Sequence, residues 1–113
     1  MDEHVFPDII TRLPKADIPF QGVTIWVLQG KHNQMAFSHM EVSGEAGEHS
    51  HGPQWGIVVE GEIELTINGQ TRTYRKGDYY YIPDNAPHSG TSKAGNYTID
   101  FFAEPDRYKL KDE

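Results

Sequence analysis

Short runs in which apolar and polar residues alternate recur along this chain, and Gly, Pro, Asn or Asp residues separate them. Alternation with a period of two is typical of strands with one buried face, and helical periodicity is scarce. Eight runs fit this pattern: 23–29, 34–42, 55–61, 62–67, 70–75, 78–83, 86–92 and 96–103. Seven or eight short strands in about a hundred residues predict an all-β fold, either a sandwich or a small barrel.

The clearest turn in the sequence is the Asn68-Gly69 pair within the stretch ELTINGQTRTY. Both central positions of a type I′ turn require a positive φ, which Asn and Gly adopt readily. The pair therefore predicts a β-hairpin with a two-residue loop.

The chain of 113 residues is long enough for one domain but not for two independent cores. We predict a single domain over 1–113, with a core barrel over about 23–103. Residues 1–22 contain three prolines and predict an irregular arm with at most a short turn at DIIT. The charged tail 104–113 is expected to fray, at least beyond Tyr108.

Composition narrows the possible classes of function. The chain has no cysteine, which excludes disulfides, thiolate metal sites and cysteine nucleophiles. Its net charge of −7 comes without a basic stripe, so we expect no nucleic-acid binding. The acidic start resembles no signal peptide, and no apolar run approaches the length of a membrane span. We therefore expect a cytoplasmic protein that does not bind membranes.

Two predicted strands, 55–59 and 99–102, are apolar on both faces. One face of each would pack on the core, and the other would be covered by a second sheet or by a partner subunit. This pattern favours a homodimer.

The stretch GEHSHGPQWG places His49 and His51 two residues apart. Residues i and i+2 of a strand point to the same face, so the two imidazoles would project side by side. The Gly-Pro turn that follows lets the register reset, so Gln54 would share this face, and Gly56 would leave open space beyond it. Taken alone, two such histidines are more often surface residues on a loop.

His88 lies in a second cluster, GDYYYIPDNAPHSG. Pro83 ends a strand there, the following Asp-Asn pair predicts a turn, and His88 opens the next strand. If strands 48–51 and 87–91 are neighbours, three imidazoles and the Gln54 amide oxygen converge. Such donors suit Zn, Ni, Fe(II) or Cu better than Mg or Ca. An amide in place of a carboxylate would leave the ion a stronger Lewis acid.

The first cluster resembles the first motif of the cupin superfamily, G(X)5HXH(X)3–4E(X)6G. It matches at His49, His51 and Gly61. Gln54 stands where the family has its Glu ligand, Gly44 is one residue closer than the pattern, and the gap after the second His is one residue short.

The second cluster resembles the second cupin motif, G(X)5PXG(X)2H(X)3N. It matches from Gly77 through Pro83 to His88. Asn85 stands where the family has Gly, and Ser92 stands where it has the closing Asn.

The combined resemblance spans about residues 34–103 and implies a cupin jelly-roll β-barrel, a fold that is commonly dimeric. It also implies one divalent transition metal ion, with Zn, Ni, Fe or Mn as candidates. The implied ligands are His49, His51, Gln54 and His88.

The stretch QWGIVVEG is similar to a Gln-X-Gly-Tyr-Val-X-X-Gly strand of small cupins that act in pectin degradation on unsaturated or keto-uronate sugars. In that group a final strand carries Asp-X-Phe with an Arg after it. Here Asp100 and Phe102 match, and Arg107 falls one residue later than expected. The resemblance implies that Asp100 is a general base or proton shuttle and that Arg107 binds a substrate carboxylate. Phe102 and Trp55 would contact the substrate.

Each role has a structural alternative. In the alternative for Gln54, its amide lies outside the inner coordination sphere, and the metal is held by three histidines and waters. Asp100 would be a structural carboxylate bonded to Tyr or Arg, and Arg107 a solvated tail residue. Trp55 would be a packing or interface aromatic. Burial of Asp100 with protein partners alone would argue against catalysis, whereas an open pocket near the metal would support it.

The leading functional expectation is a metal-assisted isomerase, ring-opening enzyme or lyase that acts on a small oxygenated substrate such as a sugar acid. A metal-dependent dioxygenase is the second enzymatic candidate, because a three-His Fe site also serves that reaction. The non-enzymatic alternative is a small-molecule-binding cupin with a structural metal. The fold alone does not choose among them.

Overall fold

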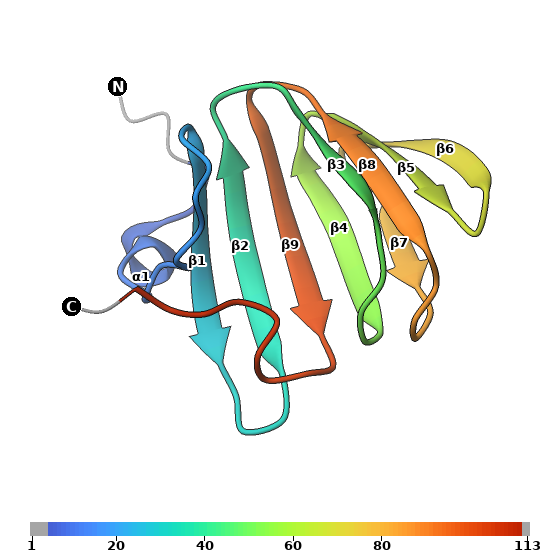
Figure 1. Cartoon of the computed structure of the whole chain (residues 1–113). Helices are drawn as coiled ribbons and strands as arrows, with labels where there is room; N and C mark the ends of the chain where they lie inside the picture. The colour runs from blue at the N-terminus through green and yellow to red at the C-terminus, as the bar shows by residue number, and fades with distance from the viewer. Residues whose placement is uncertain (1–4, 112–113) are drawn as a thin grey trace.

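The computed structural model describes residues 5–111, which form two facing antiparallel sheets and one short helix, α1 (Asp8–Thr11) (Figure 1). The five-stranded sheet has the order β1 (Val23–Gln29), β2 (Gln34–Met40), β9 (Asn96–Phe102), β4 (Gln54–Glu60) and β7 (Tyr79–Ile82). The four-stranded sheet has the order β3 (Gly44–His49), β8 (His88–Ser92), β5 (Glu62–Ile67) and β6 (Gln70–Arg75). This arrangement confirms the predicted all-β fold class. In the described range, no helix is long and apolar enough to cross a membrane.

Most strands lie where the alternating pattern predicts them. The ranges 23–29, 62–67 and 70–75 coincide with β1, β5 and β6. Asn68 and Gly69 have φ angles of 50° and 80°, and the β5–β6 hairpin closes around them as predicted. The pattern misses β3, because its sequence GEAGEH contains no large apolar residue and its middle residues are exposed.

The cross-strand register places small residues beside Asp100 on the inner face of the five-stranded sheet. Asp100 of β9 pairs with Ala36 of β2 and with Gly56 of β4. A Cβ atom on Gly56 would lie 2.2 Å from Asp100 Oδ1 and 2.4 Å from the Tyr80 ring. The open space expected at Gly56 is therefore filled by these two side chains, which meet because Gly56 has none.

Two clusters of buried apolar residues form the core: the first packs the arm and tail against the five-stranded sheet, and the second joins the two sheets. The first consists of Ala16, Ile25, Val27, Ala36 and Phe102. The second consists of Val58, Ile63, Tyr80, Ile82 and Ala86. Members of both clusters line the cavity that holds the candidate site.

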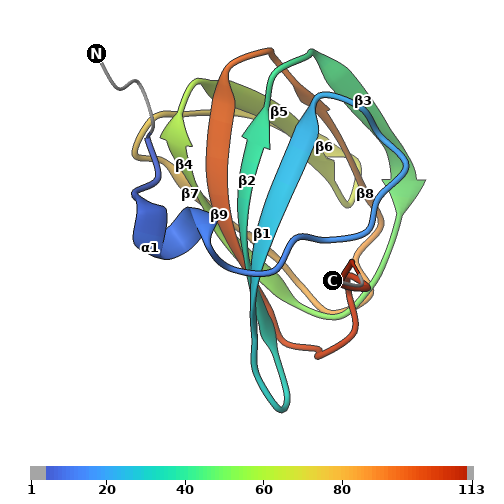
Figure 2. The same ribbon diagram turned by 90° about the vertical axis from the view of Figure 1, so that its left-hand side faces the viewer.

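The arm and the tail pair with each other beside β1. Ala16 forms an isolated bridge with Leu110, and the Asp17 N–H donates to the Lys109 carbonyl over 2.7 Å. The Lys111 N–H donates to the Lys15 carbonyl over 2.8 Å. The arm therefore provides the tail with backbone partners as far as residue 111, in the segment where the sequence predicts fraying. Figure 2 looks onto this side of the molecule, where β1 and β3 are the edge strands of the two sheets.

Candidate metal centre

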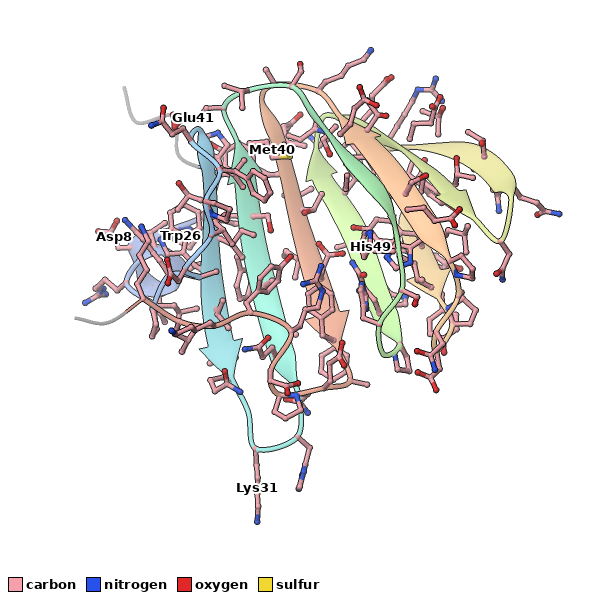
Figure 3. The ribbon with its side chains drawn as sticks, viewed as in Figure 1. Asp8, Trp26, Lys31, Met40, Glu41 and His49 are labelled. Atoms are coloured by element: carbon pink, nitrogen blue, oxygen red, sulfur yellow. The ribbon has the colours of Figure 1, made fainter. Side chains whose placement is uncertain are left out.

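Three histidines meet at one end of the space between the sheets. His49 ends β3 (Figure 3). His88 begins β8, and the two residues pair in the antiparallel register. One ligand atom of each, and one of His51, lie within 4.8 Å of one another. The predicted neighbourhood of the two strands is thus confirmed. The expectation that His51 lies in a strand is wrong, because β3 ends at His49 and the loop to β4 carries His51.

Backbone carbonyl groups orient all three imidazoles. The Nδ1 atom of each ring lies near one carbonyl oxygen: His49 near Gly47 at 2.8 Å, His51 near Gly52 at 2.8 Å, and His88 near Ala86 at 2.9 Å. Because a carbonyl only accepts, each Nδ1 carries a proton, and Nε2 keeps its lone pair in the neutral ring. Burial lowers the pKa of His51 and of His88, which favours that neutral form.

The donor set fits a divalent transition metal ion. Neutral imidazoles with Nδ1 fixed by a hydrogen bond are the usual form of metal-binding histidine. Three such donors suit Zn, Ni, Cu or Fe and leave coordination positions open for water or for a ligand oxygen. The three-histidine cluster, defined as His49, His51 and His88, could therefore hold one such ion.

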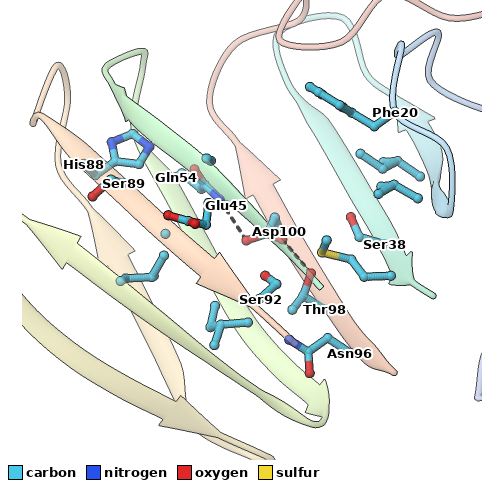
Figure 4. Close-up of a pocket in the computed structure, with 18 of the residues that line it drawn as sticks. Phe20, Ser38, Glu45, Gln54, His88, Ser89, Ser92, Asn96, Thr98 and Asp100 are labelled. Carbon is cyan, nitrogen blue, oxygen red and sulfur yellow. Dashed lines mark hydrogen bonds between the residues drawn. The ribbon is translucent and has the colours of Figure 1, made fainter. Parts of the chain in front are cut away.

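Asp100 lies on the inner face of β9, is 7% exposed, and accepts hydrogen bonds from three side chains, two of which, Gln54 and Thr98, are labelled in Figure 4. Tyr80 Oη donates to Oδ1 over 2.5 Å, and Gln54 Nε2 donates to the same oxygen over 2.9 Å. Thr98 Oγ1 donates to Oδ2 over 3.1 Å. Burial raises the pKa of Asp100 even against these donors.

Asp100 shows both the burial that would argue against a catalytic role and the access to the cavity that would support one. The carboxylate is buried and paired with protein groups, and it also lines the cavity that contains the three-histidine cluster. Gln54 lines the same cavity as His88, and its amide nitrogen donates to Asp100 (Figure 4). Its amide oxygen is then the atom that could face a metal ion or a bound water.

Tyr80 is a member of the site that the sequence did not indicate. It is 4% exposed, whereas its neighbours Tyr79 and Tyr81 are exposed, as strand alternation predicts. Burial, and then the adjacent Asp100, raise the pKa of Tyr80 well above its ordinary value, so the hydroxyl stays protonated and donates. Strand phase alone indicates that Tyr80 points inward, but only the register shows that it meets Asp100.

Arg107 and Phe102 line the cavity, as their predicted roles require. The Arg107 guanidinium lies 4.8 Å from the ring centre of Tyr108 and 5.7 Å from that of Phe102, and its Nε is buried without a hydrogen-bond partner. The predicted contact of Trp55 with substrate in this cavity is corrected by the structure. Trp55 is 41% exposed and stacks on Tyr79, because its position in β4 points away from the cavity.

The cavity measures about 560 Å³ and runs between the sheets from the three-histidine cluster to the surface near Phe20 and Val42. This volume lies in the usual range of small-molecule sites. The side chains described above therefore surround a space that a ligand could enter.

Comparisons with known proteins identify the family and the fold. A family model described as "Cupin domain" matches residues 36–96. No curated protein sequence matches the chain.

Several solved structures are similar to this chain. An RmlC-like cupin from Shewanella frigidimarina NCIMB 400 has a TM-score of 0.74 at 24% identity, covering 95% of this chain and 94% of that one. KdgF from Halomonas sp. has a TM-score of 0.70 at 21% identity, covering 81% and 86%. A variant of oxalate decarboxylase from Bacillus subtilis has a TM-score of 0.68 at 16% identity, covering 85% of this chain and 28% of that one. At these identities the likeness shows the fold alone.

Proposed function

The chain belongs to the cupin domain family, and from this premise we propose that it is a metal-dependent enzyme of the isomerase, ring-opening or lyase type. The three-histidine cluster would hold one divalent transition metal ion. Gln54 would either supply a fourth ligand through its amide oxygen or bind a metal-bound water. The substrate would be a small oxygenated acid that enters the cavity. A cytoplasmic location and a homodimer stay predictions.

The observation that carries this proposal is that oriented imidazoles and a buried carboxylate share one open cavity. Structural metal sites are closed by protein ligands, whereas catalytic sites keep an open position. An ion bound here supplies Lewis-acid polarisation of a carbonyl or hydroxyl oxygen. The cavity gives a ligand access to that position.

Asp100 is the group we propose as the general base. Its raised pKa lies closer to neutrality than that of an exposed carboxylate, and a general base works best when its pKa lies near the operating pH. Tyr80 and Gln54 fix the orientation of one carboxylate oxygen. Arg107 would bind a substrate carboxylate from the same cavity, since charge-assisted pairing with a guanidinium is strong.

Metal content is the first test of the proposal. Protein purified without a metal-affinity tag and reconstituted with Zn, Ni, Fe or Mn should contain one equivalent of metal. His88→Ala should contain none, whereas His32→Ala, which removes an exposed histidine from the β1–β2 loop, should retain it. Retention of metal in Gln54→Ala would place Gln54 outside the inner coordination sphere. A wild-type protein that stays empty would contradict the proposal.

Turnover is the second test. Metal-loaded protein should convert an oxo or uronic acid, and Asp100→Asn should lower the rate by about 10²–10⁴-fold with unchanged metal content. Iron content together with oxygen uptake would instead identify the dioxygenase. Ligand binding without conversion would identify the non-enzymatic binding protein.

A further inference from the structure

The cavity beside the three-histidine cluster has two unlike ends. Its polar end contains the cluster together with Asp100 and Arg107. Its other end opens between the arm and the β2–β3 turn, where it is lined by Phe20 and Val42, which are 67% and 46% exposed. Figure 4 shows His88 and Phe20 on opposite sides of the cavity, with Asp100 between them.

The walls between the two ends are largely apolar. Ile25 and Met40 line the cavity from the five-stranded sheet, and Ile63 and Leu65 line it from the four-stranded sheet. Gly90 pairs with Leu65, and a Cβ atom on Gly90 would lie 2.8 Å from Leu65 Cδ2. The missing side chain therefore allows Leu65 to lie across the wall, which makes this part of the wall a continuous apolar surface.

Polar side chains also line these walls, among them Ser38, Glu45, Ser89 and Ser92. Two others, Asn96 and Thr98, are already bound within the protein. Asn96 Oδ1 accepts from the Glu62 N–H over 2.9 Å, and Asn96 Nδ2 donates to the Glu62 carbonyl over 2.6 Å. The Thr98 hydroxyl donates to Asp100. These groups thus have little hydrogen-bonding capacity left for the hydroxyls of a ligand.

We propose that the substrate is an amphiphilic oxo or hydroxy acid. Its carboxylate and neighbouring oxygen would lie at the polar end, near Arg107 and the three-histidine cluster. Its aliphatic or aromatic body would lie along the apolar walls toward Phe20 and Val42. This inference rests on the proposed function, because the polar end is the same site. A sugar acid fits the walls less well, since polar side chains make up the smaller part of the lining and each buried hydroxyl without a partner weakens binding.

The length of the apolar walls sets the size of this body. His88 and Ser92 mark the two ends of β8, four residues apart, and a strand rises about 3.3 Å per residue, which gives about 13 Å. With C–C bonds of about 1.5 Å in a zigzag chain, roughly ten carbons span this distance. An acid of that length would reach from the cluster to the mouth of the cavity.

Isothermal titration calorimetry with a homologous series tests the substrate class. The probes are straight-chain 2-oxo acids of four, six, eight and ten carbons, with galacturonate as the sugar acid. Each is titrated into metal-loaded and metal-free protein, and the metal content of every sample is measured. The Kd should fall about three- to fourfold per added methylene, and galacturonate should bind more weakly than the eight-carbon acid.

Substitutions at two exposed residues, one at the mouth of the cavity and one away from it, test where the apolar body of the ligand lies. Val42→Ser, at the mouth, should weaken binding of the ten-carbon acid about three- to tenfold and leave the four-carbon acid unchanged. Ile9→Ser is the matched control, because Ile9 is 71% exposed on α1 and does not line the cavity. It should leave the whole series unchanged.

The outcomes separate this inference from the proposed function. A Kd that stays constant along the series, or galacturonate as the tightest ligand, would overturn the substrate class, even with metal bound. Rising affinity in a protein that binds no metal would support the substrate class and contradict the proposed function. An equal effect of Val42→Ser on all chain lengths would overturn the placement of the apolar body.

Discussion

Gly56 determines whether Asp100 and Tyr80 can meet. A Cβ atom there would lie 2.2 Å from the carboxylate and 2.4 Å from the phenol ring, and both groups are buried. Gly56→Ala should lower the free energy of unfolding by about 1–3 kcal/mol, because the added methyl overpacks a rigid interior. Urea denaturation measures this change.

Gly47→Ala is the matched control for that substitution. Gly47 also lies in a strand, but nothing is within 4 Å of a Cβ placed there, and its φ is not in the left-handed region. Gly47→Ala should leave stability unchanged or raise it slightly, since alanine restricts the unfolded chain. Equal changes in the free energy of unfolding for the two variants would show that Asp100 and Tyr80 do not need the space left by the missing side chain of Gly56.

The lowered pKa values of His51 and His88 predict how the free energy of unfolding of the metal-free protein depends on pH. Burial lowers both pKa values below their ordinary value of 6.5, so the unfolded chain binds more protons just below that pH. The free energy of unfolding should therefore fall as the pH drops below about 6.5, until the folded pKa values are passed. Denaturation of chelator-treated protein between pH 7.5 and 5 measures this dependence.

The double variant His51→Asn/His88→Asn provides the comparison. An asparagine keeps an N–H donor near the backbone carbonyl that each Nδ1 contacts, but it does not titrate. The pH dependence below 6.5 should flatten in this variant. A wild-type profile that is already flat would contradict the lowered pKa values.

Among the elements, the pairing of arm and tail makes a specific prediction. Leu110 is partly buried against the cluster around Ala16, and the backbone bonds of Asp17 and Lys111 flank it. Leu110→Ser should weaken this packing and speed hydrogen exchange of those two amides, because local opening frees them. Lys109→Ser, which changes an exposed side chain next to it, should leave their exchange unchanged. Fast exchange in the wild type would contradict the pairing.

Elements with one buried face could be predicted from the sequence, and others could not. β5 carries Ile63 and Leu65 in strict alternation, and the Asn-Gly pair fixes its turn, so its bounds follow from local pattern. β3 pairs through its backbone while its side chains stay largely exposed, so no apolar period marks it. The tail is ordered by the arm, a contact between the two ends of the chain that no local pattern encodes.

The residues of the candidate site also fall into two groups: those that the sequence could predict, and those whose contacts depend on the strand register. The three histidines could be predicted because their spacing around two turns matches a motif, and the pairing of β3 with β8 then brings them together. Tyr80 could not be predicted, because its contact with Asp100 depends on the register of β7, β4 and β9. The outward direction of Trp55 follows from strand phase alone, since it alternates with Gln54 and Gly56, which face the interior.

For the molecule as a whole, the outer face of the five-stranded sheet bears on the predicted homodimer. Trp55, Tyr79 and Tyr81 are 41%, 67% and 56% exposed on β4 and β7, and Trp55 stacks on Tyr79 with ring centres 6.0 Å apart. Exposed aromatic residues that gather on one face are typical of interfaces between proteins. The predicted dimer would bury this face, which the described part of the chain leaves open.

Sedimentation equilibrium tests this dimer. The wild type should sediment at twice the mass of the chain, and Trp55→Ser/Tyr81→Ser should shift it toward the single chain, because buried interface aromatics contribute most of the affinity. Leu28→Ser is the control, since Leu28 is 51% exposed on β1, at the opposite edge of the same sheet. It should remain a dimer. A dimer that survives the aromatic substitutions must use another face, and a monomeric wild type would remove the dimer itself. The site would stand in either case, because its histidines and Asp100 come from one chain.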